Sequence, residues 1–117
     1  MKRIVIVDDS QPFLEALQKS LNLLLPNNNV VYLYCLSIRQ VEKHLGENQP
    51  DVMFLDHNLS EEPGGEGLVL ATEYHEKMKI FSTSGDLTPE LVTKYQELGI
   101  EWLGKNLKNI YKEIKNL

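Results

Sequence analysis

The chain has 117 residues and a mass of 13.4 kDa, which suits one domain of ordinary size, and we expect residues 1–117 to form a single domain. With 12 Lys and Arg against 17 Asp and Glu, the formal net charge is −5, which argues against a protein that holds nucleic acid or an anionic membrane by charge. A composition with 42% hydrophobic and 25% charged residues excludes the disordered, collagenous and coiled-coil classes.

The sequence also indicates the cellular compartment. Cys35 is the only cysteine, so the fold does not depend on a disulfide or on an oxidising compartment. The apolar run at 4–7 is too short for a secretory signal, and the run at 30–36 is far below the roughly 18 residues of a membrane span. We therefore expect a cytoplasmic protein without a membrane partner.

Short apolar runs alternate with helical patterns from the N-terminus onward. Residues 4–7 form a β-branched run that is typical of a strand buried on both faces. Pro12 suits the first turn of the next helix, in which leucines recur every three or four residues until Pro26. A strand is expected at 30–35, and Ser37 then begins a second helix with a capping-box pattern.

The second half of the chain repeats this alternation. The remaining expected elements are strands at 52–55, 80–83 and 100–103 and helices at 68–76, 88–98 and 107–114, with a glycine-rich loop at 60–67. Five strands that alternate with five helices predict an α/β fold with a doubly wound parallel sheet. Its common strand order is 2-1-3-4-5, the flavodoxin-like (βα)5 arrangement, and the ligand crevice of that fold lies at the carboxyl ends of strands one and three.

Polar residues follow four of the predicted strands. They are Asp8 and Asp9 after the first, Asp56 after the third, Ser84 after the fourth and Lys105 after the fifth. The predicted order brings the three carboxylates together, where they repel one another unless a cation neutralises them. Oxygen ligands alone favour Mg²⁺ or Mn²⁺. A lysine and a hydroxyl beside such an ion suit phosphoryl transfer, in which a carboxylate can be the nucleophile.

Four motifs carry a resemblance to a known family. They are Ile-Val-Ile-Val before Asp8 and Asp9, Val-Met-Phe-Leu before Asp56, Ser84-Gly85, and the segment at 102–105 that ends in Lys105. In this order and spacing they resemble the receiver domains of two-component response regulators over nearly the whole chain. The resemblance implies a stand-alone receiver, a phosphoacceptor signalling protein that catalyses only its own phosphorylation and dephosphorylation.

The resemblance also implies a role for each residue. Asp56 would accept a phosphoryl group from a histidine kinase or a phosphotransfer protein, and a surface that binds a downstream protein would change in response. Mg²⁺, or Mn²⁺ in its place, would be held by Asp9 directly, by Asp8 mainly through water, by Asp56 and by the backbone carbonyl of Asn58. Ser84 would hydrogen-bond the phosphoryl group, Lys105 would pair with it, and Trp102 would be the switch aromatic that follows the hydroxyl of Ser84.

The sequence departs from the family at several positions. Thr83 is also a hydroxyl residue, and counting back from Lys105 selects Thr83 where spacing to the next glycine selects Ser84. Asn106 and Ser60 stand where the family usually has proline, and the loop at 60–67 is about three residues longer than usual. These departures concern the surroundings of the acidic cluster, and the choice between Ser84 and Thr83 stays open at this stage.

Two other functions remain compatible with these residues. One is a receiver-like interaction module that is not phosphorylated, which the long loop and the missing proline suggest. The other is a Mg²⁺-dependent phosphohydrolase with Asp56 as nucleophile, although phosphatases of the haloacid-dehalogenase type require a second acid where this chain has Asn58. Taken singly, Trp102 could be a packing residue and Cys35 a small residue of the core.

Overall fold

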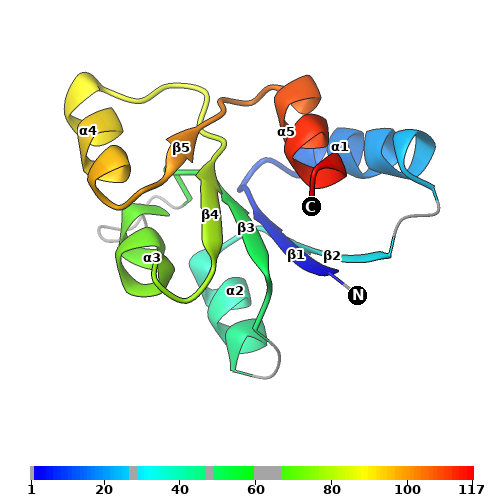
Figure 1. Ribbon diagram of the computed structural model, residues 1–117, viewed down its shortest axis with the longest axis horizontal. Coiled ribbons are helices and arrows are strands. Elements are labelled where there is room, and N and C mark those ends of the chain that lie inside the picture. The colour runs from blue at the N-terminus through cyan, green and yellow to red at the C-terminus, as the bar shows by residue number, and fades with distance from the viewer. Residues whose placement is uncertain (1, 27–28, 47–48, 60–66) are drawn as a thin grey trace.

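The sheet has the predicted strand order. The structure is a computed structural model that describes residues 2–26, 29–46, 49–59 and 67–117. Its elements are β1 (Lys2–Val7), α1 (Gln11–Leu24), β2 (Val30–Cys35), α2 (Ile38–Leu45), β3 (Val52–Leu55), α3 (Gly67–Tyr74), β4 (Lys79–Ser82), α4 (Pro89–Glu97), β5 (Glu101–Trp102) and α5 (Leu107–Lys115). The strands pair in parallel in the order β2-β1-β3-β4-β5 (Figure 1), which confirms the doubly wound (βα)5 architecture.

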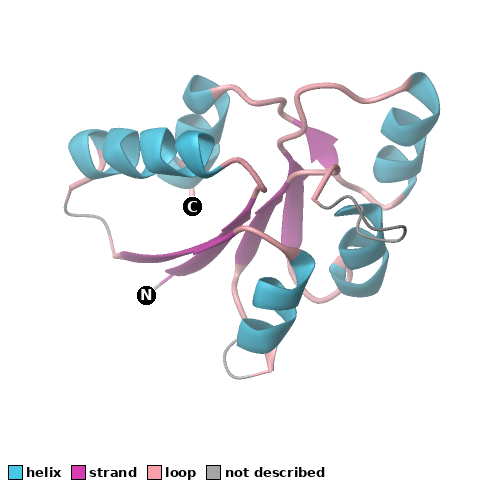
Figure 2. Ribbon diagram, turned by 180° about the vertical axis from the view of Figure 1, so that it is seen from behind, coloured by secondary structure: helices cyan, strands magenta, loops and turns pink. Residues whose placement is uncertain are grey.

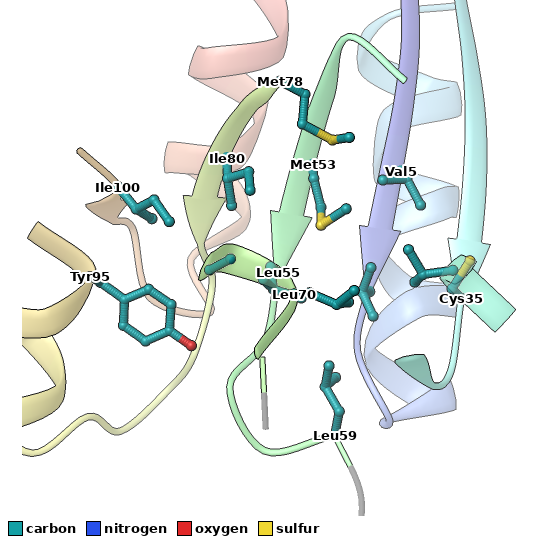
Figure 3. Packing of buried hydrophobic residues seen from close by; sticks show 13 residues of the cluster. Val5, Cys35, Met53, Leu55, Leu59, Leu70, Met78, Ile80, Tyr95 and Ile100 are labelled. Carbon is teal, nitrogen blue, oxygen red and sulfur yellow. The ribbon is translucent and has the colours of Figure 1, made fainter. Parts of the chain in front are cut away.

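Successive residues of each inner strand point to opposite faces of the sheet. Ile4 and Ile6 of β1 belong to the core cluster under α1 and α5. Val5 and Val7 belong to the other cluster, which includes Tyr95 of α4 as well as residues of α2 and α3 (Figure 3). The clusters therefore place α1 and α5 on one face of the sheet and α2, α3 and α4 on the other, and Figure 2 shows helices on both sides of the sheet. The near-continuous apolar runs of β1 and β3 reflect this burial on both faces.

Four helices begin at a polar side chain that accepts a backbone N–H of the first turn. The capping residues are Ser10, Ser37, Thr88 and Asn106. Such a bond satisfies a donor that the helix itself leaves unpaired. Asn106 stands where the resemblance leads one to expect proline, and it starts α5 by accepting the N–H of Lys108 (3.0 Å).

The fifth strand is shorter than predicted. We expected a strand at 100–103, whereas the strand that pairs with β4 covers only Glu101–Trp102. The N–H of Leu103 still donates to the carbonyl oxygen of Ser82 (2.7 Å). Gly104 then adopts a φ of 72°, a left-handed conformation that glycine tolerates and that ends the extended run. The turn places the next residue at the carboxyl edge of the sheet.

The third helix begins one residue earlier than predicted and ends two residues earlier, since it spans Gly67–Tyr74 in place of 68–76. The N–H of Gly67 donates to the carbonyl oxygen of His57 (2.6 Å), so α3 starts against the chain that leaves β3. The predicted loop at 60–67, with Ser60, lies outside the described residues except for its last position. Within the described ranges, the helices are all too short or too polar to cross a membrane.

Candidate functional site at the carboxyl ends of the strands

The acidic residues lie together at the carboxyl edge of the sheet. Val7 and Leu55 are register partners in β1 and β3, and the N–H of Asp56 donates to the carbonyl oxygen of Val7 (2.9 Å). The residues that follow the two strands are therefore neighbours. One carboxylate oxygen from each of Asp8, Asp9 and Asp56 lies within 4.8 Å of the others, with Asp8 and Asp56 buried and Asp9 exposed.

Lys105 extends from the end of β5 to this cluster. Its Nζ lies 3.2 Å from Oδ2 of Asp8 and 3.8 Å from Oδ2 of Asp56, and it also lies 5.2 Å from the centre of the Phe13 ring. About a third of the Lys105 side chain is exposed (34%). The structure therefore places one cation, still open to solvent, against two buried carboxylates.

Burial and charge oppose each other in this cluster. Burial is the largest effect on Asp8 and Asp56 and raises the pKa of both, against the lowering effect of Lys105. For Lys105, burial works against the charged form, but the two carboxylates outweigh it and raise the pKa of the ammonium group. One lysine thus compensates only part of the negative charge that three acids bring together.

The donor set fits a divalent cation. Oδ2 of Asp8 is buried and accepts no hydrogen bond from the described residues, although it forms an ion pair with Lys105. Three carboxylates that offer oxygens close together are the ligands that hard cations such as Mg²⁺ and Mn²⁺ prefer. Asn58, expected to contribute its backbone carbonyl, lies two residues past Asp56 and is exposed. The residues present therefore suit a metal ion of this class.

The geometry distinguishes Ser84 from Thr83. Oγ of Ser84 donates to Oδ1 of Asp56 (3.0 Å) and accepts the backbone N–H of His57 (2.6 Å). Oγ1 of Thr83 is also buried but has no hydrogen-bond partner in the part of the chain that the structure describes. Of the two, Ser84 is therefore the hydroxyl residue that contacts the acidic cluster, and the geometry favours Ser84 for the role that residue spacing left open.

Trp102 contacts the same segment from β5. Its Nε1–H donates to the backbone carbonyl of Ser84 (2.7 Å). The Trp102 side chain is 42% exposed and so lies outside the core, whereas Cys35 is buried as expected. The aromatic ring thus links the hydroxyl segment to the outer surface beside α4.

Sequence analysis did not predict the surroundings of His57. The ring is buried at 7% exposure, and its Nδ1 lies 2.8 Å from the hydroxyl of Tyr95 on α4. The two rings meet edge to face, with centres 5.8 Å apart. The position of His57 directly after Asp56 was the only signal for it in the sequence, and Tyr95 fits the apolar periodicity of its helix, which predicts only a core residue.

Comparison with known proteins supports the fold. No family model and no curated protein sequence matches the chain. Among solved structures, the signal receiver domain of a DNA-binding response regulator from Colwellia psychrerythraea 34H is similar, with a TM-score of 0.83, 22% identity, and 99% and 97% of the two chains covered. A CheY-like receiver domain protein from Methanospirillum hungatei JF-1 has a TM-score of 0.77 and 19% identity, covering 99% and 92%.

A third similar structure is the Mn²⁺-bound form of response regulator Rcp1, with a TM-score of 0.77, 19% identity, and 99% and 91% of the chains covered. The protein therefore has the receiver-domain fold of response regulators. At these identities the likeness concerns the fold, and the chemistry of the site has to be argued from this chain's own residues.

Proposed function

We propose that the protein is a phosphoacceptor of a two-component or phosphorelay system, with Asp56 as the residue that is phosphorylated. The observation that carries the proposal is the position of the Asp56 carboxylate, which lies among Asp8, Asp9, Lys105 and the hydroxyl of Ser84. The receiver-domain fold supports it. The phosphoryl donor would be phosphohistidine on a histidine kinase or on a phosphotransfer protein.

The reaction would be a transfer from nitrogen to oxygen. A carboxylate oxygen of Asp56 attacks phosphorus in line, the bond between phosphorus and the imidazole nitrogen breaks, and the imidazole leaves with the electron pair. Asp56 has to be ionised to attack, and Lys105 favours that form. Ser84 can donate a hydrogen bond to a phosphoryl oxygen, and Lys105 can neutralise charge there.

A divalent ion belongs to the same proposal. Asp8, Asp9, Asp56 and the backbone carbonyl of Asn58 would hold it, and Mg²⁺ is the ion we propose, with Mn²⁺ as a substitute. When bound, it would offset the negative charge of the carboxylates and of the incoming phosphoryl oxygens. The Mn²⁺ bound in the structurally similar response regulator supports an ion of this class.

The output would be a change in a protein-binding surface formed by α4, β5 and α5. Trp102 is exposed on this side and bonds the backbone of Ser84, so a movement of the hydroxyl segment has a route to the surface. A phosphorylated population would then differ from the resting one in its affinity for a downstream protein. We place this exchange in the cytoplasm, in keeping with the proposed kinase or phosphotransfer donor.

The test is phosphate incorporation from acetyl phosphate in the presence of Mg²⁺, read by intact mass and by mapping the modified residue. We expect one phosphoryl group on Asp56, no labelling of Asp56→Asn, and unchanged labelling of Asp51→Asn, which alters an exposed acid at the other end of β3. Equal labelling of wild type and Asp56→Asn would remove the assignment. Absence of labelling from acetyl phosphate and from a panel of phosphorylated histidine kinases would favour the interaction module.

A further inference from the structure

The pair formed by His57 and Tyr95 joins α4 directly to the chain segment of the phosphoacceptor. Tyr95 is 1% exposed and His57 is 7% exposed, and their polar atoms lie 2.8 Å apart. A hydrogen bond that is shielded from water in this way is stronger than an exposed one and costs more to break. The proposed function assigns the pair no task, although His57 is the residue next to Asp56.

The contact continues from His57 into the site. The backbone N–H of His57 donates to Oγ of Ser84 at 2.6 Å, and that hydroxyl donates to Oδ1 of Asp56 at 3.0 Å. Three successive hydrogen bonds therefore run from α4 to the carboxylate. The indole N–H of Trp102 donates to the backbone carbonyl of Ser84, so β5 also contacts Ser84, independently of His57.

Phosphorylation would disturb this chain at the hydroxyl. A Ser84 hydroxyl has one proton to donate, and a phosphoryl oxygen is a stronger acceptor than an esterified carboxyl group. A hydroxyl that shifts toward the phosphoryl group to donate to it would carry Oγ away from the N–H of His57 and so weaken the bond between them. The ring of His57 also lines a hollow between α3 and α4, together with Leu68 and Leu91.

We propose that Tyr95 is a positioning residue that, acting through His57, holds the hydroxyl of Ser84 at its resting place. The position of α4 and the chemical state of Asp56 then depend on each other, because each biases the same chain of hydrogen bonds. The coupling between α4 and Asp56 rests on the proposed function, whereas the positioning of Ser84 by Tyr95 does not.

The positioning of Ser84 by Tyr95 is tested by a double-mutant cycle on the unfolding equilibrium with Tyr95→Phe and Ser84→Ala. Phenylalanine keeps the ring in the core and removes only the hydroxyl. We expect the effect of Ser84→Ala on the unfolding equilibrium constant to be about fivefold smaller in the Tyr95→Phe background, the scale of one net hydrogen bond. Additive effects would overturn the proposal, and the measurement needs neither metal nor phosphate.

The coupling between α4 and Asp56 is tested with beryllofluoride in the presence of Mg²⁺, because beryllofluoride is a stable mimic of a phosphoryl group on a carboxylate. The backbone amide NMR shifts of α4 are followed during the titration. In wild type we expect shifts along residues 89–97. In Tyr95→Phe we expect these shifts to be lost and the affinity for beryllofluoride to rise about fivefold, because the resting hydroxyl is held less firmly.

Tyr34→Phe is the matched control. The Tyr34 hydroxyl is buried without a hydrogen-bond partner in the described residues and lies on β2, so its removal should leave the α4 response intact. A full α4 response in Tyr95→Phe would overturn the coupling to Asp56. If wild type itself bound no beryllofluoride at Asp56, the proposed function would fail, and the unfolding cycle alone would decide whether Tyr95 positions Ser84.

Discussion

The ionised carboxylate of Asp56 lowers the stability of the folded protein by an amount that depends on pH. Burial raises its pKa above the usual 3.8, although Lys105 and the hydrogen bond from Ser84 act in the other direction. The folded protein therefore holds this proton more tightly than the unfolded chain does. The resulting stabilisation is complete below about pH 3.8 and is lost as the pH rises through the higher pKa of the folded state.

We accordingly expect Asp56→Asn to raise the free energy of unfolding of the metal-free protein by roughly 1–2 kcal/mol at about pH 7, because it removes a buried charge of which only part is compensated. The gain should shrink as the pH falls toward about 4, where wild-type Asp56 also becomes neutral. Urea unfolding across this range measures it, with Asp51→Asn as the control. A gain that stayed constant with pH would contradict the assigned cause.

Thr83 and Ser84 offer a second test at the scale of single side chains. The Thr83 hydroxyl is buried with no partner in the described residues, so Thr83→Val should raise the free energy of unfolding by about 1 kcal/mol. Ser84→Ala removes two hydrogen bonds and should lower the free energy of unfolding. It should also slow labelling by acetyl phosphate by about tenfold or more. Unfolding curves and initial labelling rates check both. A loss of labelling in Thr83→Val would reverse the assignment.

Residue spacing could not separate these two neighbours, because the count depends on the lengths of intervening loops. The structure separates them through the hydrogen bonding of each hydroxyl just past the end of β4. The hydroxyl of Ser84 donates to Asp56, and that of Thr83 has no hydrogen-bond partner in the described residues. The residue types at the site were predictable from their places after the strands, whereas the direction of each side chain required coordinates.

Gly67 determines how closely α3 approaches Asp56. A Cβ atom at this position would meet the backbone carbonyl of Asp56, and backbone cannot move aside as a side chain does. We expect Gly67→Ala to lower the free energy of unfolding by roughly 1–3 kcal/mol. It should also reduce labelling of Asp56, because the added Cβ displaces the backbone carbonyls of Asp56 and His57. Chemical denaturation and the labelling assay measure the two effects.

Gly46 is the matched control for this substitution. It ends α2 with a φ of −70° and has open space around its Cα. Gly46→Ala should therefore be neutral or stabilise the protein by up to about 1 kcal/mol through the unfolded state. If both glycines tolerated alanine equally well, the close approach of α3 to Asp56 would not be a constraint on the fold.

The elements themselves were largely predictable, and the exceptions have physical causes. Capping residues such as Ser37 and Thr88 mark helix starts in the sequence, and the structure confirms both. The length of β5 was overestimated, because a two-residue edge strand is defined by its pairing with β4 and by the turn at Gly104. The pair of His57 and Tyr95 depends on how α4 packs over the sheet, which local patterns do not encode.

At the scale of the whole molecule, the strand order follows from connection rules and from burial on both faces. Each parallel strand needs a crossover helix, and an order that winds in both directions from β1 leaves one switch point. Residues as far apart in sequence as Asp8 and Lys105 meet there, with Nζ 3.2 Å from Oδ2. The topology thus gathers negative charge at one edge, and Lys105 offsets only part of it within the described part of the chain.

The stability of the whole molecule should therefore respond to divalent ions. An ion that binds the folded state alone stabilises it by about 1.4 kcal/mol at ten times its dissociation constant. We expect Mg²⁺ to raise the melting temperature of wild type in proportion to the logarithm of its concentration above that constant, and to have little effect on Asp9→Asn, which loses an exposed carboxylate of the cluster.

Differential scanning calorimetry at constant ionic strength measures this response, with Na⁺ replacing Mg²⁺ in the reference so that general screening is equal. Asp51→Asn makes the same change of charge at the opposite end of the sheet and should retain the full response. An equal rise for all three proteins would show that Mg²⁺ acts on the net charge of −5 as a whole, and not at the carboxyl ends of β1 and β3.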